Sequence, residues 1–156
     1  MKKKILITGG SGFIGTNLIN YLLKNKNNKI ICLDNLSSSS KKNIVQFRSN
    51  KNFSFIKHNI TNKINLKVDE IYNLACPASP INYQKMPIET LKTNFEGTLN
   101  LLELAKKNNS KFLQASTSEI YGDPITTPQI ETDWGNVNPV GLRSCYDEGK
   151  RTAETL

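Results

Sequence analysis

Two residues near the end of this 156-residue chain have the types and spacing of a proton-transfer site. Tyr146 and Lys150 are four residues apart, so on a helix they would share one face. A neighbouring ammonium group favours the ionised form of a phenol, whose ordinary pKa is roughly 10. A tyrosine assisted in this way can act as a base. The same spacing also occurs on ordinary helix surfaces, so the pair alone does not decide between the two interpretations.

Two further polar residues precede this pair. Thr117 follows an apolar run of strand type, and its hydroxyl can bind the same substrate oxygen as a catalytic tyrosine. Glu119 lies two residues later, and we expect it on the same side of an extended segment. Thr117, Glu119, Tyr146 and Lys150 are therefore the candidate catalytic residues.

The beginning of the chain has the order strand, glycine turn, helix. The apolar residues 5–7 are followed by the glycine-rich segment 9–15 and then by leucines at helical spacing. Such a turn lets the backbone approach a pyrophosphate, and the N–H groups at a helix N-terminus bind phosphates. A second apolar run ends at Asp34, where a carboxylate would bind ribose hydroxyls and repel a 2′-phosphate. The pattern predicts dinucleotide binding, with NAD favoured over NADP, although Asp34 alone would also suit the start of a turn.

Strand and helix patterns alternate along the rest of the chain. Further strands are expected at 53–56, 70–75 and 111–115, and a helix is expected at 88–107, where apolar residues recur at spacings of three and four. We therefore predict an α/β fold, a Rossmann-type doubly wound parallel sheet. Because no linker divides the chain, residues 1–156 are expected to form one NAD-binding Rossmann domain.

Composition excludes several other classes of protein. The net charge of +8 comes from lysines scattered among asparagines, without an arginine cluster interleaved with aromatic residues, so we expect no nucleic-acid partner. No apolar run is long enough for a membrane span or a signal peptide, so we expect no membrane association and a cytoplasmic location. Three widely spaced cysteines indicate reduced thiols and no metal site.

The chain resembles the extended short-chain dehydrogenase/reductase family, and within it the UDP-glucuronate decarboxylases. The similarity extends over essentially the whole sequence. Its most specific segments are residues 74–80, 92–94, 116–124, 134–139 and 143–151. Glu119 favours this branch, because UDP-galactose epimerases and nucleotide-sugar 4,6-dehydratases usually carry another residue there.

This resemblance implies conversion of UDP-glucuronate to UDP-xylose with a tightly held, recycled NAD. Tyr146, assisted by Lys150, would remove the proton of the sugar 4-hydroxyl while hydride passes from C4 to NAD+. The resulting ketone lies β to the C5 carboxylate, so CO2 can leave, and hydride then returns to C4. Thr117 would hold the O4 oxygen, and Glu119 would orient the sugar ring or its carboxylate.

The resemblance also implies a set of binding residues. The implied cofactor contacts are Gly9, Gly12, Phe13, Ile14, Gly15, Asp34, Asn35, Ser37, Ser38, Asn59, Ile60, Leu74, Ala75, Thr93, Tyr146 and Lys150. The implied substrate contacts are Lys92, Asn100, Thr117 and Glu119. Asn59 departs from the family pattern, in which an aspartate usually contacts adenine, but its amide can still form a hydrogen bond.

Family members are much longer than this chain. We expect the missing part to supply the last strands of the sheet and a C-terminal substrate domain. The full-length enzyme is expected to be a homodimer that pairs through helices beginning near Ile88 and Cys145. We expect this polypeptide alone to be inactive and poorly stable. Two alternatives remain: a nucleotide-sugar 4-epimerase or 4,6-dehydratase, and an inactive, truncated NAD-binding remnant.

Overall fold

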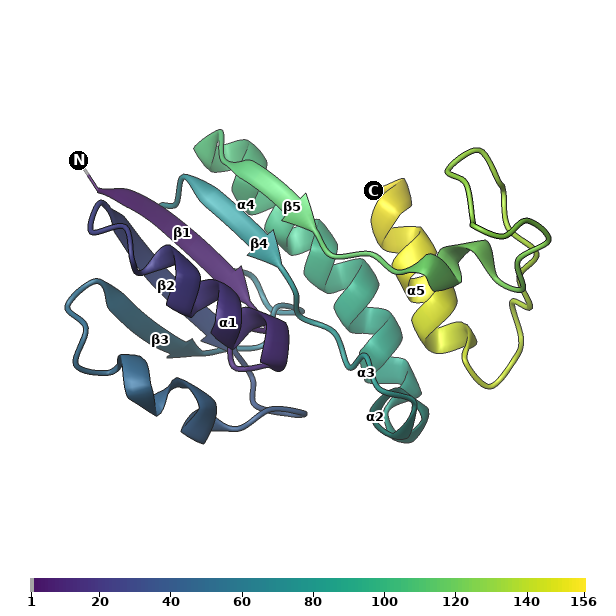
Figure 1. Cartoon of the computed structure of the whole chain (residues 1–156), viewed down its shortest axis with the longest axis horizontal. Helices are drawn as coiled ribbons and strands as arrows, with labels where there is room; N and C mark the ends of the chain where they lie inside the picture. Colours follow the sequence, from purple (N-terminus) through teal and green to yellow (C-terminus); the bar gives the residue numbers. More distant parts are fainter. Residues whose placement is uncertain (1) are drawn as a thin grey trace.

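A five-stranded parallel sheet forms the centre of the computed structural model, which describes residues 2–156 (Figure 1). The strands are β1 (Lys3–Thr8), β2 (Asn28–Asp34), β3 (Phe53–Lys57), β4 (Glu70–Asn73) and β5 (Lys111–Gln114). Their order across the sheet is β3-β2-β1-β4-β5. The chain thus runs outward from β1 to β3 and then crosses back to β4 and β5. This order confirms the predicted doubly wound sheet.

The strands are apolar because both faces of the sheet are covered. Along β1, Ile5 and Ile7 belong to one hydrophobic cluster and Leu6 to another, because successive side chains point to opposite faces. On the face of Ile5 and Ile7, α1 (Phe13–Leu22) contributes the fully buried Ile19.

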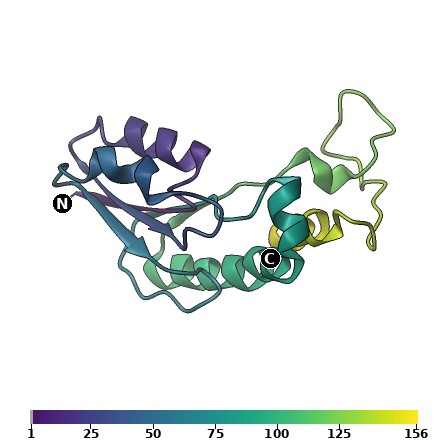
Figure 2. The same ribbon diagram turned by 90° about the horizontal axis from the view of Figure 1, so that it is seen from below.

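Helices lie on the two sides of the sheet (Figure 2). The helix α1 and the 3-10 helix η1 (Lys41–Phe47) cover one face, and η1 contributes Ile44 and Phe47 to the core there. The helix α4 (Thr98–Asn108) covers the other face through Leu101 and Leu104. The two layers hold the strands in register, so the loops at the carboxyl ends of the strands have fixed starting points.

The helix α4 is the end of a longer continuous helix. α3 (Pro87–Lys92) passes through one turn of π-helix, η2 (Thr93–Gly97), and continues as α4. The predicted helix at 88–107 is therefore confirmed, whereas the π turn was not predicted. A side chain at Gly97 would lie 2.5 Å from the Cδ1 atom of Ile60, so any larger residue there would force the Ile60 side chain, in the loop after β3, to move.

The apolar stripe of this helix is only partly buried. Leu91, Phe95 and Leu99 are 44%, 43% and 38% exposed, while Thr90 and Asn94 from the same helix are buried. The side of α3 and η2 that faces the molecule packs against the C-terminal helix through small and polar groups. An apolar stripe is consequently left on the outside.

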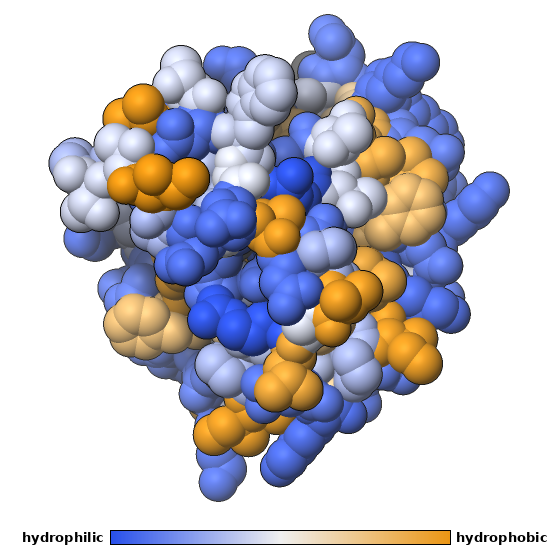
Figure 3. Space-filling model, turned by 90° about the vertical axis from the view of Figure 1, so that its right-hand side faces the viewer, coloured by the Kyte–Doolittle hydropathy of each residue, from blue (hydrophilic) through white to orange (hydrophobic). Residues whose placement is uncertain are grey.

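The chain that follows β5 extends away from the sheet (Figure 1). After β5 come the 3-10 helix η3 (Ser118–Tyr121), a long loop, and α5 (Ser144–Thr155), which packs against α3 and η2. Figure 3 shows hydrophobic side chains among hydrophilic ones on this side of the molecule. The long loop exposes Ile125, Val140 and Leu142.

A short helix, α2 (Pro80–Lys85), precedes α3. Among the described residues, none of the helices has the length and apolar character needed to cross a membrane.

Candidate active site

A cleft opens at the carboxyl ends of β1, β2 and β4. Its walls include the turn after β1, Asp34 at the end of β2, and the segment that begins at Leu74 after β4. The predicted cofactor contacts that line it are Gly9, Gly12, Asp34, Asn35, Ser37, Ser38, Asn59, Ile60, Leu74, Ala75 and Thr93. The lining residues that sequence reasoning missed are Leu33, Ser39, His58, Cys76 and Pro77. Of these, His58 directly follows β3, and that position was the available signal for it.

The glycine turn after β1 shapes one wall of this cleft. Gly9 has a φ of 64°, and a side chain there would lie 2.7 Å from the carbonyl oxygen of Leu74. At Gly12 the nearest atom to an added side chain is the carbonyl oxygen of Gly9, 3.2 Å away. Gly9 is therefore required by the fold itself, whereas Gly12 lines the cleft with open space on the other sides of an added side chain.

Three predicted cofactor contacts in the first turn of α1 are not part of the cleft lining. Phe13 and Ile14 are exposed, and Gly15 is buried. A side chain on Gly15 would lie 2.6 Å from the carbonyl oxygen of Gly9 and from the Cα atom of Gly10. Gly15 accordingly allows α1 to start close to the turn.

Asp34 is buried and its carboxylate accepts hydrogen bonds at both oxygens. Oδ2 accepts from the Ser11 N–H at 3.0 Å, while Oδ1 accepts from the Leu36 N–H at 2.8 Å and from the Ser39 hydroxyl at 3.0 Å. These bonds hold the Asp34 side chain at the end of β2, where it lines the cleft.

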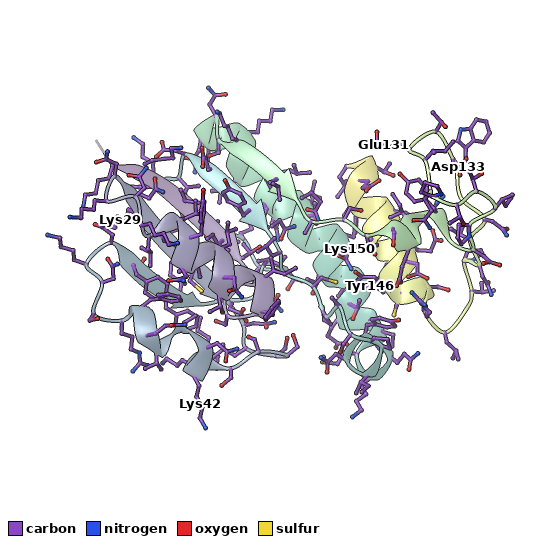
Figure 4. All side chains as sticks on the ribbon, viewed as in Figure 1. Lys29, Lys42, Glu131, Asp133, Tyr146 and Lys150 are labelled. Atoms are coloured by element: carbon purple, nitrogen blue, oxygen red, sulfur yellow. The ribbon has the colours of Figure 1, made fainter. Side chains whose placement is uncertain are left out.

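Tyr146 and Lys150 lie on α5, on the side that faces the rest of the molecule (Figure 4). Both are buried, and the Lys150 Nζ atom is 5.9 Å from the centroid of the Tyr146 ring. Nζ donates a hydrogen bond of 2.8 Å to the carbonyl oxygen of Ala115. The Tyr146 ring stacks on Tyr83 with a centroid distance of 5.1 Å and an interplanar angle of 11°. Sequence reasoning missed Tyr83, because no spacing links it to α5.

The predicted effect of the lysine on the phenol is not found in this structure. Burial raises the pKa of Tyr146, and the Thr117 side chain opposes that rise. Burial also lowers the pKa of Lys150. The physical reason for the difference is that the ammonium group is directed to a backbone carbonyl, while both side chains lose water.

The prediction of an extended segment through Glu119 is wrong. β5 ends at Gln114, and Glu119 lies in the 3-10 helix η3. The Thr117 hydroxyl accepts a hydrogen bond of 3.3 Å from the Glu119 N–H and so caps this short helix. The chain therefore turns at the point where an extended strand was expected, because the threonine side chain satisfies one of the free N–H groups at the start of the helix.

Glu119 forms an ion pair with Arg143, whose Nε atom is 3.8 Å from Oδ2 of Asp147. The bond to Arg143 lowers the pKa of Glu119. Burial, together with the nearby Glu119 carboxylate, raises the pKa of Asp147 to about 6. The three side chains line a second cavity with Ser118 and Asn138. Arg143 and Asp147 were not predicted as site residues, although both lie in the motif that contains Tyr146.

The two remaining predicted substrate contacts lie apart from this group. Lys92 is exposed in the last turn of α3. Asn100 donates a hydrogen bond of 2.9 Å to the carbonyl oxygen of Ile60, which belongs to the cofactor cleft. Within residues 2–156, no group of three or more histidine, cysteine, aspartate or glutamate side chains is arranged to hold a metal ion.

The parallel sheet, the glycine turn at its first strand and the cleft beside it define a Rossmann-type fold of the extended short-chain dehydrogenase/reductase kind. A family model described as GDP-mannose 4,6 dehydratase matches residues 6–156, and the chain belongs to that family.

Known proteins agree with this assignment. The chain is 53% identical over 159 residues to UDP-glucuronic acid decarboxylase 4 of Arabidopsis thaliana and 50% identical over 155 residues to UDP-glucuronic acid decarboxylase 1 of Xenopus tropicalis. These alignments cover 100% and 99% of this chain but 36% and 37% of the relatives. The chain thus spans a little over one third of the length of these relatives.

A solved structure supports an NAD-binding fold. The dTDP-glucose 4,6-dehydratase of Bacillus anthracis, determined in complex with NAD, is 32% identical to this chain and superimposes with a TM-score of 0.81. The match covers 98% of this chain and 48% of the dehydratase chain.

Proposed function

We propose that this chain is the NAD-binding domain, with the catalytic tyrosine, of an enzyme that decarboxylates UDP-glucuronate to UDP-xylose. One observation carries the proposal: the chain is 53% identical over its whole length to a UDP-glucuronic acid decarboxylase. The position of Glu119 beside Thr117, and the Tyr146 and Lys150 pair on α5, support it. Residues 1–156 would then hold the cofactor, and a substrate domain would complete the sugar site.

The groups that line the cleft support the proposal that it binds NAD. The open side of Gly12 leaves room for a pyrophosphate, and the buried Asp34 carboxylate suits ribose hydroxyls. Asn35, Ser37 and Ser38 would hold the adenosine half, with Asn59 near the adenine. Leu74, Ala75 and Thr93 would contact the other half. When bound, NAD+ supplies a hydride acceptor and donor for sugar C4, and we propose that it is held tightly and recycled.

Residues of this chain would accept the proton and bind the sugar. Tyr146 would take the proton of the 4-hydroxyl, and Thr117 would hold the same oxygen. Lys150 does not lower the pKa of Tyr146 in this structure, but its Nζ atom lies 5.9 Å from the centroid of the Tyr146 ring, and we propose that its ammonium group stabilises the phenolate once it forms. With a ketone at C4, the C5 carboxylate leaves as CO2, and C5 then gains a proton. Glu119 would orient the sugar ring or its carboxylate, and Lys92 and Asn100 remain proposed substrate contacts.

The active enzyme is proposed to be a homodimer. The exposed stripe of Leu91, Phe95 and Leu99 on the long helix is an apolar surface that a second copy would cover. The helix α5 packs against α3 and η2, which carry Leu91 and Phe95, so pairing would also stabilise the element that carries Tyr146.

A chimera tests the proposed reaction. This chain would replace the matching part of the Arabidopsis thaliana decarboxylase, and the products formed from UDP-glucuronate would be identified by mass spectrometry. We expect UDP-xylose and CO2. An epimerised UDP-sugar acid without CO2 release would instead support a 4-epimerase, and a chimera that folds and binds NAD without any turnover would contradict the enzymatic role.

A further inference from the structure

The carboxylate of Asp34 is already occupied by donors from the protein. The Ser11 N–H binds Oδ2, and both the Leu36 N–H and the Ser39 hydroxyl bind Oδ1, at 2.8 and 3.0 Å. A carboxylate offers about four acceptor sites in total. Three protein donors therefore leave about one site for a ligand.

Two of these donors are fixed by the backbone. Ser11 is fully buried in the glycine turn after β1. Leu36 has a φ of 65°, which is uncommon for a residue other than glycine, and its N–H closes a tight turn onto the carboxylate two residues earlier. Neither N–H group can leave Asp34 unless the backbone moves.

The third donor is of a different kind. Ser39 is partly exposed and lines the cleft, and its hydroxyl reaches Asp34 through a single rotatable side-chain bond. A change of rotamer is enough to release this bond. Of the three donors, the Ser39 hydroxyl is thus the one that a ligand can displace at little cost to the fold.

We propose that Ser39 is an internal competitor for the ligand's ribose. The ligand class is an adenine nucleotide with a free ribose 2′,3′-diol, and the inference rests on the NAD binding proposed above. A diol presents two O–H donors, whereas Asp34 has about one acceptor site open while Ser39 is bound. A diol that donates both hydrogen bonds to Asp34 must therefore displace the Ser39 hydroxyl, and the affinity of the cleft is lower than Asp34 alone would provide. Ser39 sets how firmly the cofactor is held.

Calorimetric titration of the 156-residue chain with NAD+ tests this role. For Ser39→Ala we expect binding about threefold to tenfold tighter than for the unsubstituted chain, because the freed site accepts from a ribose hydroxyl. Ser49→Ala is the matched control, since Ser49 is exposed and outside the cleft lining, and it should leave the dissociation constant unchanged. Ser39→Thr keeps the hydroxyl and should retain the original affinity.

A second pair of ligands isolates the diol. Ser39→Ala should tighten the binding of ADP but not that of 2′,3′-dideoxy-ADP, which lacks both hydroxyls. Thermal melting of each variant confirms that the folded chain is titrated. Unchanged NAD+ affinity in Ser39→Ala would overturn the competitor role, and weaker affinity would show that Ser39 binds the ligand directly. If neither NAD+ nor ADP bound to any of these proteins, the proposed cofactor site would fail as well.

Discussion

Lys150 donates its hydrogen bond to the carbonyl oxygen of Ala115, at 2.8 Å, and its ammonium group lies 5.9 Å from the centroid of the Tyr146 ring. The bond ties α5 to the chain that leaves β5, so the helix that carries the proposed base is anchored to the sheet. It also keeps a positive charge in a buried position. Stability and proposed chemistry therefore depend on the same side chain.

Replacing this lysine should change how stability depends on pH. Burial lowers the pKa of Lys150, so the folded chain binds fewer protons here than the unfolded chain does between the lowered value and the ordinary 10.5. Across that interval the contribution of Lys150 to stability rises with pH. Lys150→Met removes the contribution, so its melting temperature relative to the original chain should fall as the pH rises from neutral to alkaline.

Lys106→Met is the control for this prediction, because Lys106 is exposed on α4. Its melting temperature should keep a constant offset from that of the unsubstituted chain. A constant offset for Lys150→Met as well would mean that the buried ammonium group does not influence stability.

The two glycines of the first turn should respond differently to alanine. Gly9→Ala forces a side chain into a left-handed conformation and against the Leu74 carbonyl. The conformation alone costs about 1–2 kcal/mol, and the melting temperature should fall by at least about 2 °C. Gly12→Ala should melt near the original temperature but lose NAD+ binding, since its methyl group faces the cleft. Differential scanning fluorimetry and calorimetry measure the two effects, and equal melting temperatures for both variants would contradict this division of roles.

Asp147 should destabilise the chain at neutral pH. Its pKa is raised to about 6 from 3.8, so it stabilises the folded state below pH 3.8 and this contribution is lost as the pH rises through about 6. Asp147→Asn should therefore raise the melting temperature at pH 7.5 and leave it nearly unchanged at pH 4. Glu154→Gln, at an exposed position of the same helix, should not reproduce this pH-dependent difference. A gain for Asp147→Asn that is the same at both pH values would show that the charge of Asp147 is not its cause.

The exposed stripe predicts where the proposed dimer forms. In the chimera described above, Phe95→Glu should shift the molecular mass measured by light scattering from dimer to monomer. Phe95 is 43% exposed, so we expect little effect on the fold of one copy. Lys106→Glu, also on an exposed position of the long helix, should leave the dimer intact. A dimer that persists in Phe95→Glu would place the interface elsewhere.

Much of the sheet could be predicted because each strand is recognised from its own short run of apolar residues. Runs such as Ile5, Leu6 and Ile7 are apolar throughout, as strands covered on both faces must be, and the observed strands lie within about two residues of the predicted ones. The position of the cleft could be predicted once the sheet was, since Asp34 and Leu74 lie at the carboxyl ends of strands. These strands are close in the sheet although they are distant in the sequence.

The arrangement around Glu119 could not be predicted because it depends on distant contacts. The ion pair with Arg143 joins two ends of a long loop whose path has no hydrophobic period. The stacking of Tyr83 on Tyr146 joins α2 to α5 in the same way. The π turn at 93–97 is another such case, because it accompanies the close approach of Gly97 to Ile60.

Release of CO2 from UDP-glucuronate labelled at the carboxyl carbon is the most direct test of the central claim. It would be measured for the chimera and for the same chimera carrying Tyr146→Phe. We expect release by the former and a loss of about 10²–10⁴-fold in the latter, with NAD+ still bound. Equal release by both proteins, or no release by the chimera with NAD+ bound, would contradict the proposal that Tyr146 is the base of a UDP-glucuronate decarboxylase.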